Sequence, residues 1–170
     1  IETLGEATTP AFIPTRFRTH FFRVSLRHRP ELRLCSQELQ AARWMPAQAW
    51  WQQWQRGRLL CAPPTLAVVH ALAQDPRATD APLLRVDMTP EGRVPWVESV
   101  GGVRMLAVRS NTIPPAQHTN CFWFGGDGDG AHRVLVDPSP SSEQEAQRLL
   151  ATIGDWGVDT VFITHHHPDH

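Results

Sequence analysis

The sequence predicts an α+β or layered α/β fold, in which two regions of mixed strands and helices follow one another. Short β-branched runs in the second half of the chain surround one amphipathic helical segment, and the first half places two helical segments after a strand-like run. Apolar residues make up 41% of the 170 residues, enough for a packed core. The formal net charge of −1 gives no general attraction to nucleic acid or to an anionic membrane.

Residues 1–74 are expected to hold one strand and two helices. Apolar and polar side chains alternate over 22–26, which is typical of a strand, and a second extended segment is expected around residues 32–34. The segment 46–57 predicts a helix, because it begins with proline, ends with glycine and carries two tryptophans four positions apart. Thr65 is expected to cap a second helix after two prolines.

Residues 75–97 are interpreted as a linker between two domains. Prolines recur in this segment with little periodicity around them. One short strand is expected within it, over residues 83–86.

The sequence pattern of residues 98–170 predicts several strands and one helix. The expected elements are strands at 103–108, 121–124 and 133–136, a glycine-rich hairpin loop at 125–130, a helix from 142 to 154 and a buried strand at 158–164. Ser142 and Glu145 have the spacing of a capping box, and Gly154 suits the end of the helix.

Cys35, Cys61 and Cys121 are widely separated, odd in number and without CxxC spacing. This pattern favours reduced thiols in a cytosolic protein, most simply as small buried hydrophobic residues. The chain opens without a secretory leader and has no apolar run near the ~18 residues that span a bilayer. The sequence therefore predicts a soluble, cytoplasmic protein without a membrane partner, and the missing initiator methionine indicates a truncated N-terminus.

Potential metal ligands crowd the segment that follows the last predicted strand. They are His165, His166, His167, Asp169 and His170. In an extended segment His165 and His167 project to one side and His166 to the other, so the pair can share one metal. Pro168 favours an extended backbone before it, and the turn beyond would bring Asp169 and His170 to a second position. Imidazole suits zinc, iron or related ions, and a carboxylate can orient a metal-bound water.

Other interpretations of these residues stay open. The histidine cluster could be an expression tag or a solvated surface turn, although neither explains a strand running directly into the ligands. Asp137 could support a ligand histidine or simply begin a turn. Residues 118–120 could contribute to a site, but they are more simply polar loop residues at the end of a strand.

The order of these motifs resembles the metallo-β-lactamase fold. Residues 165–170 match its HxHxDH signature, and 161–164 resembles the strand that leads into it. Upstream, 119–124 is similar to the family's "TN-apolar" strand, and 134–138 to its "IDPG" element, with Ser139 where glycine is usual. The resemblance covers about residues 98–170 and implies the first half of an αββα sandwich.

The resemblance also implies a role for each residue of the signature. His165 and His167 would bind a first divalent metal ion and Asp169 and His170 a second, with zinc favoured and iron or manganese as alternatives. Asp169 would also be the catalytic carboxylate, Asp137 would support a ligand, and His166 would have no role. A metal-bound hydroxide would attack an ester, thioester, lactam or phosphodiester. The family's remaining ligands follow this motif, so the chain is expected to be a fragment of a larger bacterial protein and to bind metal weakly.

Segments of the first region resemble the C-terminal half of a Nudix-like α/β/α domain. They are 9–10, 14–22, 36–38, 43–45 and 63–65. The glutamate-rich box that holds diphosphate-bound magnesium in that family would precede Ile1. Glu38 is therefore interpreted as an acid in a loop or at a strand edge.

The sequence thus predicts a metal-dependent hydrolase with a Nudix-like domain that recognises a substrate or partner. A small-molecule thioester or a nucleotide-containing molecule is the expected substrate, and RNA is an alternative. The other hypotheses are a non-enzymatic, truncated binding protein and a Nudix-type hydrolase whose catalytic box lies upstream. The oligomeric state stays open, although incomplete domains should expose apolar surface and favour association.

Overall fold

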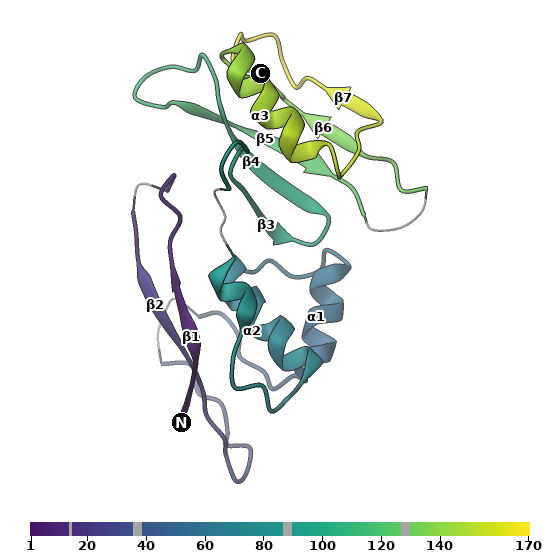
Figure 1. Cartoon of the computed structure of the whole chain (residues 1–170). Coiled ribbons are helices and arrows are strands. Elements are labelled where there is room, and N and C mark those ends of the chain that lie inside the picture. Colours follow the sequence, from purple (N-terminus) through teal and green to yellow (C-terminus); the bar gives the residue numbers. More distant parts are fainter. Residues whose placement is uncertain (14, 36–38, 87–89, 127–129) are drawn as a thin grey trace.

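The computed structural model describes residues 1–13, 15–35, 39–86, 90–126 and 130–170. A two-stranded ribbon and two helices are followed by a five-stranded sheet with one helix (Figure 1). The mixed α/β class predicted from the sequence is confirmed. The expected Nudix-like domain stays a prediction, and Glu38 and the hairpin-loop residues 127–129 lie outside the described residues.

Strands β1 (Glu2–Thr8) and β2 (Arg18–Arg23) form the antiparallel ribbon. The sequence did not predict β1, and the strand expected over 22–26 ends at Arg23. No strand or helix forms around residues 32–34.

Two short helices follow the ribbon. Helix α1 (Ala47–Gln55) confirms the predicted helix, with Pro46 as its N-cap and Trp54 buried. Helix α2 (Pro63–Gln74) is also present, but the prediction that Thr65 caps it is wrong. Both prolines lie in its first turn and Ala62 is the N-cap, because proline has no N–H to satisfy there and its fixed φ suits a helix start.

The expected strand over 83–86 is also wrong. Residues Pro82–Arg85 form a 3₁₀ helix, η1, in which the Leu84 N–H donates to Ala81 O at 3.0 Å. Ala81 is completely buried, and its N–H donates to Leu4 O of β1 at 3.1 Å. This contact with the ribbon fixes the backbone before Pro82 and favours a tight turn there over a strand.

The five strands of the sheet lie in chain order. They are β3 (Trp96–Val100), β4 (Val103–Arg109), β5 (His118–Phe124), β6 (Val134–Val136) and β7 (Thr160–Phe162). Neighbouring strands are antiparallel except β6 and β7, which are parallel. Strand β3 begins inside the segment interpreted as a linker, and β5 includes residues 118–120, which were expected in a loop.

Helix α3 (Glu143–Ile153) connects β6 to β7 and covers one face of the sheet (Figure 1). The core between them consists of Val94, Leu106, Val108, Cys121, Trp123, Leu135, Leu149 and Ile153. Ser142 caps the helix as predicted, because its Oγ accepts from the Glu145 N–H at 3.2 Å. The Glu145 carboxylate accepts from the N–H of Arg109 instead of completing the capping box.

One charged side chain enters the aromatic end of this core. The Arg104 guanidinium lies over three tryptophan rings, with centroid distances of 5.4 Å to Trp96, 4.7 Å to Trp123 and 4.5 Å to Trp156. Its Nε donates to Glu98 at 3.2 Å. The charge is therefore paired with a carboxylate and in contact with aromatic faces.

The helices contact the sheet at the β3–β4 turn. Trp54 Nε1 donates to Ser99 O at 3.2 Å, and the Cys61 N–H donates to the same oxygen at 2.8 Å. A Cβ on Gly101 would lie 2.4 Å from Trp54 O, so this approach requires glycine.

Strand β7 is exposed, so the prediction of a buried strand at this position is wrong. Val161 and Phe162 are each 55% exposed, because β7 is the last strand of the described sheet.

The prediction of buried cysteines holds for Cys61 and Cys121 but is wrong for Cys35, which is exposed. Among the helices described, none combines the length and apolar character needed to cross a membrane.

Candidate metal centre

The histidine-rich loop leaves the sheet where two parallel strands end. Asp137 directly follows β6, and Thr164 lies two residues beyond β7. The Asp137 N–H donates to Phe162 O at 3.0 Å, which extends the pairing of the two strands. The carboxyl ends of parallel strands share one edge of a sheet, so residues 165–170 begin next to Asp137.

The Asp137 carboxylate accepts three hydrogen bonds. Oδ1 accepts from the Thr164 N–H at 2.8 Å, and Oδ2 accepts from Thr164 Oγ1 at 2.7 Å and from His170 Nδ1 at 3.0 Å. Asp137 is buried, with 5% of its surface exposed. Burial by itself raises the pKa of this carboxyl, but the bonds from Thr164 and His170 outweigh it and hold the pKa below its ordinary value. Asp137 is therefore ionised at neutral pH and only accepts hydrogen bonds.

The hydrogen positions in this network follow from the ionised carboxylate. The Thr164 hydroxyl donates its one hydrogen to Asp137, so its oxygen accepts from His165 Nδ1, 2.9 Å away. His170 Nδ1 also carries a hydrogen, because it faces the same carboxylate. With the hydrogen on Nδ1, the Nε2 atom of each neutral ring form is the nitrogen whose lone pair can bind a metal ion.

Four residues predicted as ligands lie together in this loop. The ring centroid of His165 is 4.0 Å from that of His170 and 4.7 Å from that of His167. Asp169 Oδ2 lies 3.9 Å from His170 Nε2. The ring of His166, which was expected to have no role, is 5.2 Å from that of His167. The backbone bends and turns over these residues instead of running extended, with the His170 N–H donating to His167 O at 3.0 Å.

Contacts from neighbouring segments hold the loop in place. Ser139 Oγ donates to Pro168 O at 3.0 Å. Thr112, in the β4–β5 connection, lies near Asp169, and its side chain is the main cause that holds the pKa of the Asp169 carboxyl below its usual value. Asp169 therefore stays ionised at neutral pH, as a metal ligand requires.

The donor types suit a divalent metal ion, although their present arrangement does not surround one. Imidazole nitrogen and carboxylate oxygen are ligands that zinc prefers, and the histidine–carboxylate pairing of His170 with Asp137 is typical of metal sites. Within the described ranges, no group of three or more His, Cys, Asp or Glu side chains is placed to hold a metal. The His165 and His167 rings meet edge to face at 83°, and a bound ion would require side chains of this loop to rearrange.

The contributions of Thr164 and Thr112 were not predicted from the sequence. Thr164 directly precedes the first histidine of the motif. Its place in the sequence could therefore have indicated a contact with His165. Thr112 lies in the β4–β5 connection and gave no such signal. Cys121, by contrast, is not reactive, because burial and then the nearby charge of Asp137 raise the pKa of its thiol to about 12.

Comparison with known proteins finds sequence similarity in the same part of the chain. Residues 114–170 match the family model described as the metallo-beta-lactamase superfamily. Hydroxyacylglutathione hydrolases from two Pseudomonas aeruginosa strains, LESB58 and PAO1, are each 36% identical to the chain over 56 residues. This match covers 33% of the chain and 21% of each relative. No solved structure gives a significant match.

Proposed function

We propose that this chain forms part of a metal-dependent hydrolase of the metallo-β-lactamase superfamily, with the loop 165–170 supplying metal ligands. The observation that carries the proposal is the network around Asp137, which leaves Nε2 of His165 and His170 free to bind metal. The family match over residues 114–170 supports the same class of protein.

In this proposal His165 and His167 hold one divalent ion, and Asp169 and His170 hold a second. A bound ion, zinc in the first place, would make a water-derived nucleophile available near neutral pH and would polarise the carbonyl oxygen of the substrate. The chain's own residues position the ligands, because Asp137 orients His170 and, through Thr164, His165.

We propose a thioester as the substrate, because both curated relatives are named hydroxyacylglutathione hydrolases. Hydrolysis would break the carbon–sulfur bond, join a water oxygen to the acyl carbon and leave a free thiol and a carboxylic acid. The chain spans 21% of the length of these relatives, so the activity of a whole protein is itself part of the proposal.

Zinc binding by single-alanine variants tests the ligand assignment. His165→Ala and His167→Ala should each weaken zinc affinity about 10-fold or more, measured by competition with a chromophoric chelator. His166→Ala is the matched control in the same loop and should bind zinc as the original chain does. An equal loss in all three variants would contradict the assignment.

Hydrolysis is then tested on the complete gene product. With S-lactoylglutathione as substrate, loss of thioester absorbance should be at least about 100-fold slower in His167→Ala and unchanged in His166→Ala. A zinc-binding protein that leaves this thioester intact but cleaves a simple ester or a phosphodiester would keep the metal site and overturn the proposed substrate.

A further inference from the structure

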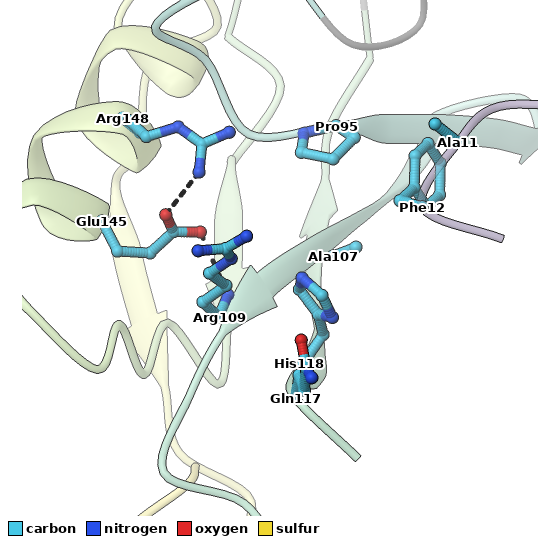
Figure 2. A pocket seen from close by; sticks show the side chains of 9 residues that line it. All are labelled: Ala11, Phe12, Pro95, Ala107, Arg109, Gln117, His118, Glu145 and Arg148. Carbon is cyan, nitrogen blue, oxygen red and sulfur yellow. Dashed lines mark hydrogen bonds and ion pairs between the residues drawn. The ribbon is translucent and has the colours of Figure 1, made fainter. Parts of the chain in front are cut away.

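A separate hollow of about 480 Å³ opens at the end of β4. Figure 2 shows the residues that line it, which are Ala11, Phe12, Pro95, Ala107, Arg109, Gln117, His118, Glu145 and Arg148. They come from the β1–β2 connection, strands β4 and β5, the residues just before β3 and β5, and helix α3, and none belongs to the histidine loop. The volume lies in the range of about 300–1,000 Å³ that is typical of small-molecule sites.

The hollow carries more positive than negative charge. Arg109 and Arg148 line it with one carboxylate, Glu145, which is 3% exposed. Glu145 is already fully engaged, since Oε2 accepts from Arg148 Nη1 at 2.7 Å and Oε1 accepts from the Arg109 N–H at 3.0 Å (Figure 2). Among the described residues, the exposed Arg109 guanidinium forms no ion pair. Its charge is therefore available to a ligand.

His118 lies beside Arg109 at the hollow. These two residues pair across β4 and β5. Burial lowers the pKa of His118, and the charge of Arg109 lowers it further, while Glu145 opposes and Arg148 adds to this effect. His118 is therefore a neutral imidazole at pH 7, which can donate a hydrogen bond to a ligand without a charge of its own.

The opposite side of the hollow is apolar. Phe12 and Pro95 stand across from the two arginines (Figure 2), and Ala107 is buried beneath them with 8% exposure. A flat apolar group can pack on the Phe12 ring while a charged group attached to it reaches Arg109. The hollow thus offers one cationic and one apolar surface to the same molecule.

We propose that this hollow binds a small organic oxyanion, a carboxylate or a phosphate monoester carried on a flat apolar group. Arg109 selects the anion, and Phe12 contacts the apolar group. No residue that lines the hollow is a candidate metal ligand, so this proposal does not rest on the proposed hydrolase activity.

Four probes of similar size test the proposal on the 170-residue chain by isothermal titration at low salt. Benzoate and phenyl phosphate should bind at least about tenfold more tightly than benzyl alcohol, and benzylamine should bind least. The tighter of the two anions identifies the carboxylate or the phosphate as the preferred head group. Equal binding of benzoate, benzyl alcohol and benzylamine would overturn the proposal.

Three variants distinguish the contributions of the cationic and the apolar surface to binding. Arg109→Gln should weaken benzoate about fivefold or more and leave benzyl alcohol unchanged, which also shows that the hollow is intact. Phe12→Ala should weaken both molecules. Arg58→Gln removes an exposed arginine outside the hollow and should change neither. Benzoate binding that survives Arg109→Gln undiminished would refute the assignment.

Discussion

Replacing Asp137 by asparagine should reverse the hydrogen positions on two histidines of the candidate metal centre. The amide keeps one oxygen for the Thr164 N–H, but an NH₂ group, which only donates, replaces the oxygen that now accepts from Thr164 Oγ1 and His170 Nδ1. Thr164 then donates its hydrogen to His165 Nδ1, and His170 Nδ1 becomes an acceptor. Both rings would carry their hydrogen on Nε2, the nitrogen that a metal ion needs.

The size of the effect follows from three bonds that lose a charged acceptor. A hydrogen bond to a charged group contributes about 1.5–3 kcal/mol and a neutral one about 0.5–1.5, so the variant should be about 3 kcal/mol less stable to unfolding. Zinc affinity should fall about 10- to 100-fold. Because the folded-state pKa of Asp137 is lowered, its stabilisation is present above the unfolded pKa of about 3.9 and is lost as pH falls through the folded pKa. Asp137→Asn has no carboxylate at this position, so its free energy of unfolding should not show this part of the decrease at acid pH.

Nitrogen NMR of the imidazole rings at neutral pH, without metal, detects the reversal directly. The control is Asp159→Asn, which changes a carboxylate that accepts from the Arg133 N–H at 2.8 Å and contacts no histidine of the loop. The reasoning fails if His165 and His170 keep their hydrogen on Nδ1 in Asp137→Asn. It also fails if zinc binds both variants equally.

Three further perturbations test the packing. Arg104→Leu should lower the free energy of unfolding in urea by about 2–4 kcal/mol, because cation–π contacts with three tryptophan rings are lost and Glu98 loses its arginine partner; a change below about 1 kcal/mol would show that the charge contributes little. A thiol reagent should modify Cys35 rapidly and the buried thiols, Cys121 among them, only on unfolding, and Cys35→Ser should remove the rapid phase. Apolar side chains exposed on β7 should make the chain self-associate at micromolar concentration in sedimentation velocity, and Phe162→Lys should shift it toward monomer; a concentration-independent monomer would contradict this.

The elements predicted correctly are those with strong local signals. The capping spacing at 142–145 and the runs of apolar, β-branched or aromatic residues in β4, β6 and the second half of β5 act within a few residues, so the sequence alone reveals them. Strand β1 lacks such a pattern, because Gly5 interrupts its register and its partner strand supplies the pairing. The 3₁₀ helix η1 likewise depends on a bond between Ala81 and Leu4, far apart in sequence.

The candidate site divides in the same way. Its candidate ligands and the position of Asp137 follow from short motifs, so they could be predicted without the structure. The directions of the bonds among Asp137, Thr164 and His170 could not be predicted, since they depend on how the two strand ends meet in space. The contact of Thr112 with Asp169 depends on the path of a whole loop, which no local pattern specifies.

The way the loop 165–170 is held changes the expected reason for weak metal binding. An unordered segment loses about 1–2 kcal/mol of conformational entropy per residue when a metal fixes it, and that loss is taken from the binding free energy. Here Asp137 binds both ends of the loop, through Thr164 and His170, and Ser139 donates to Pro168. Contacts within the chain therefore order much of the loop before any metal binds, so metal binding loses less conformational entropy. The rearrangement that the ligand side chains must make should then limit the affinity more than the ordering of the loop does.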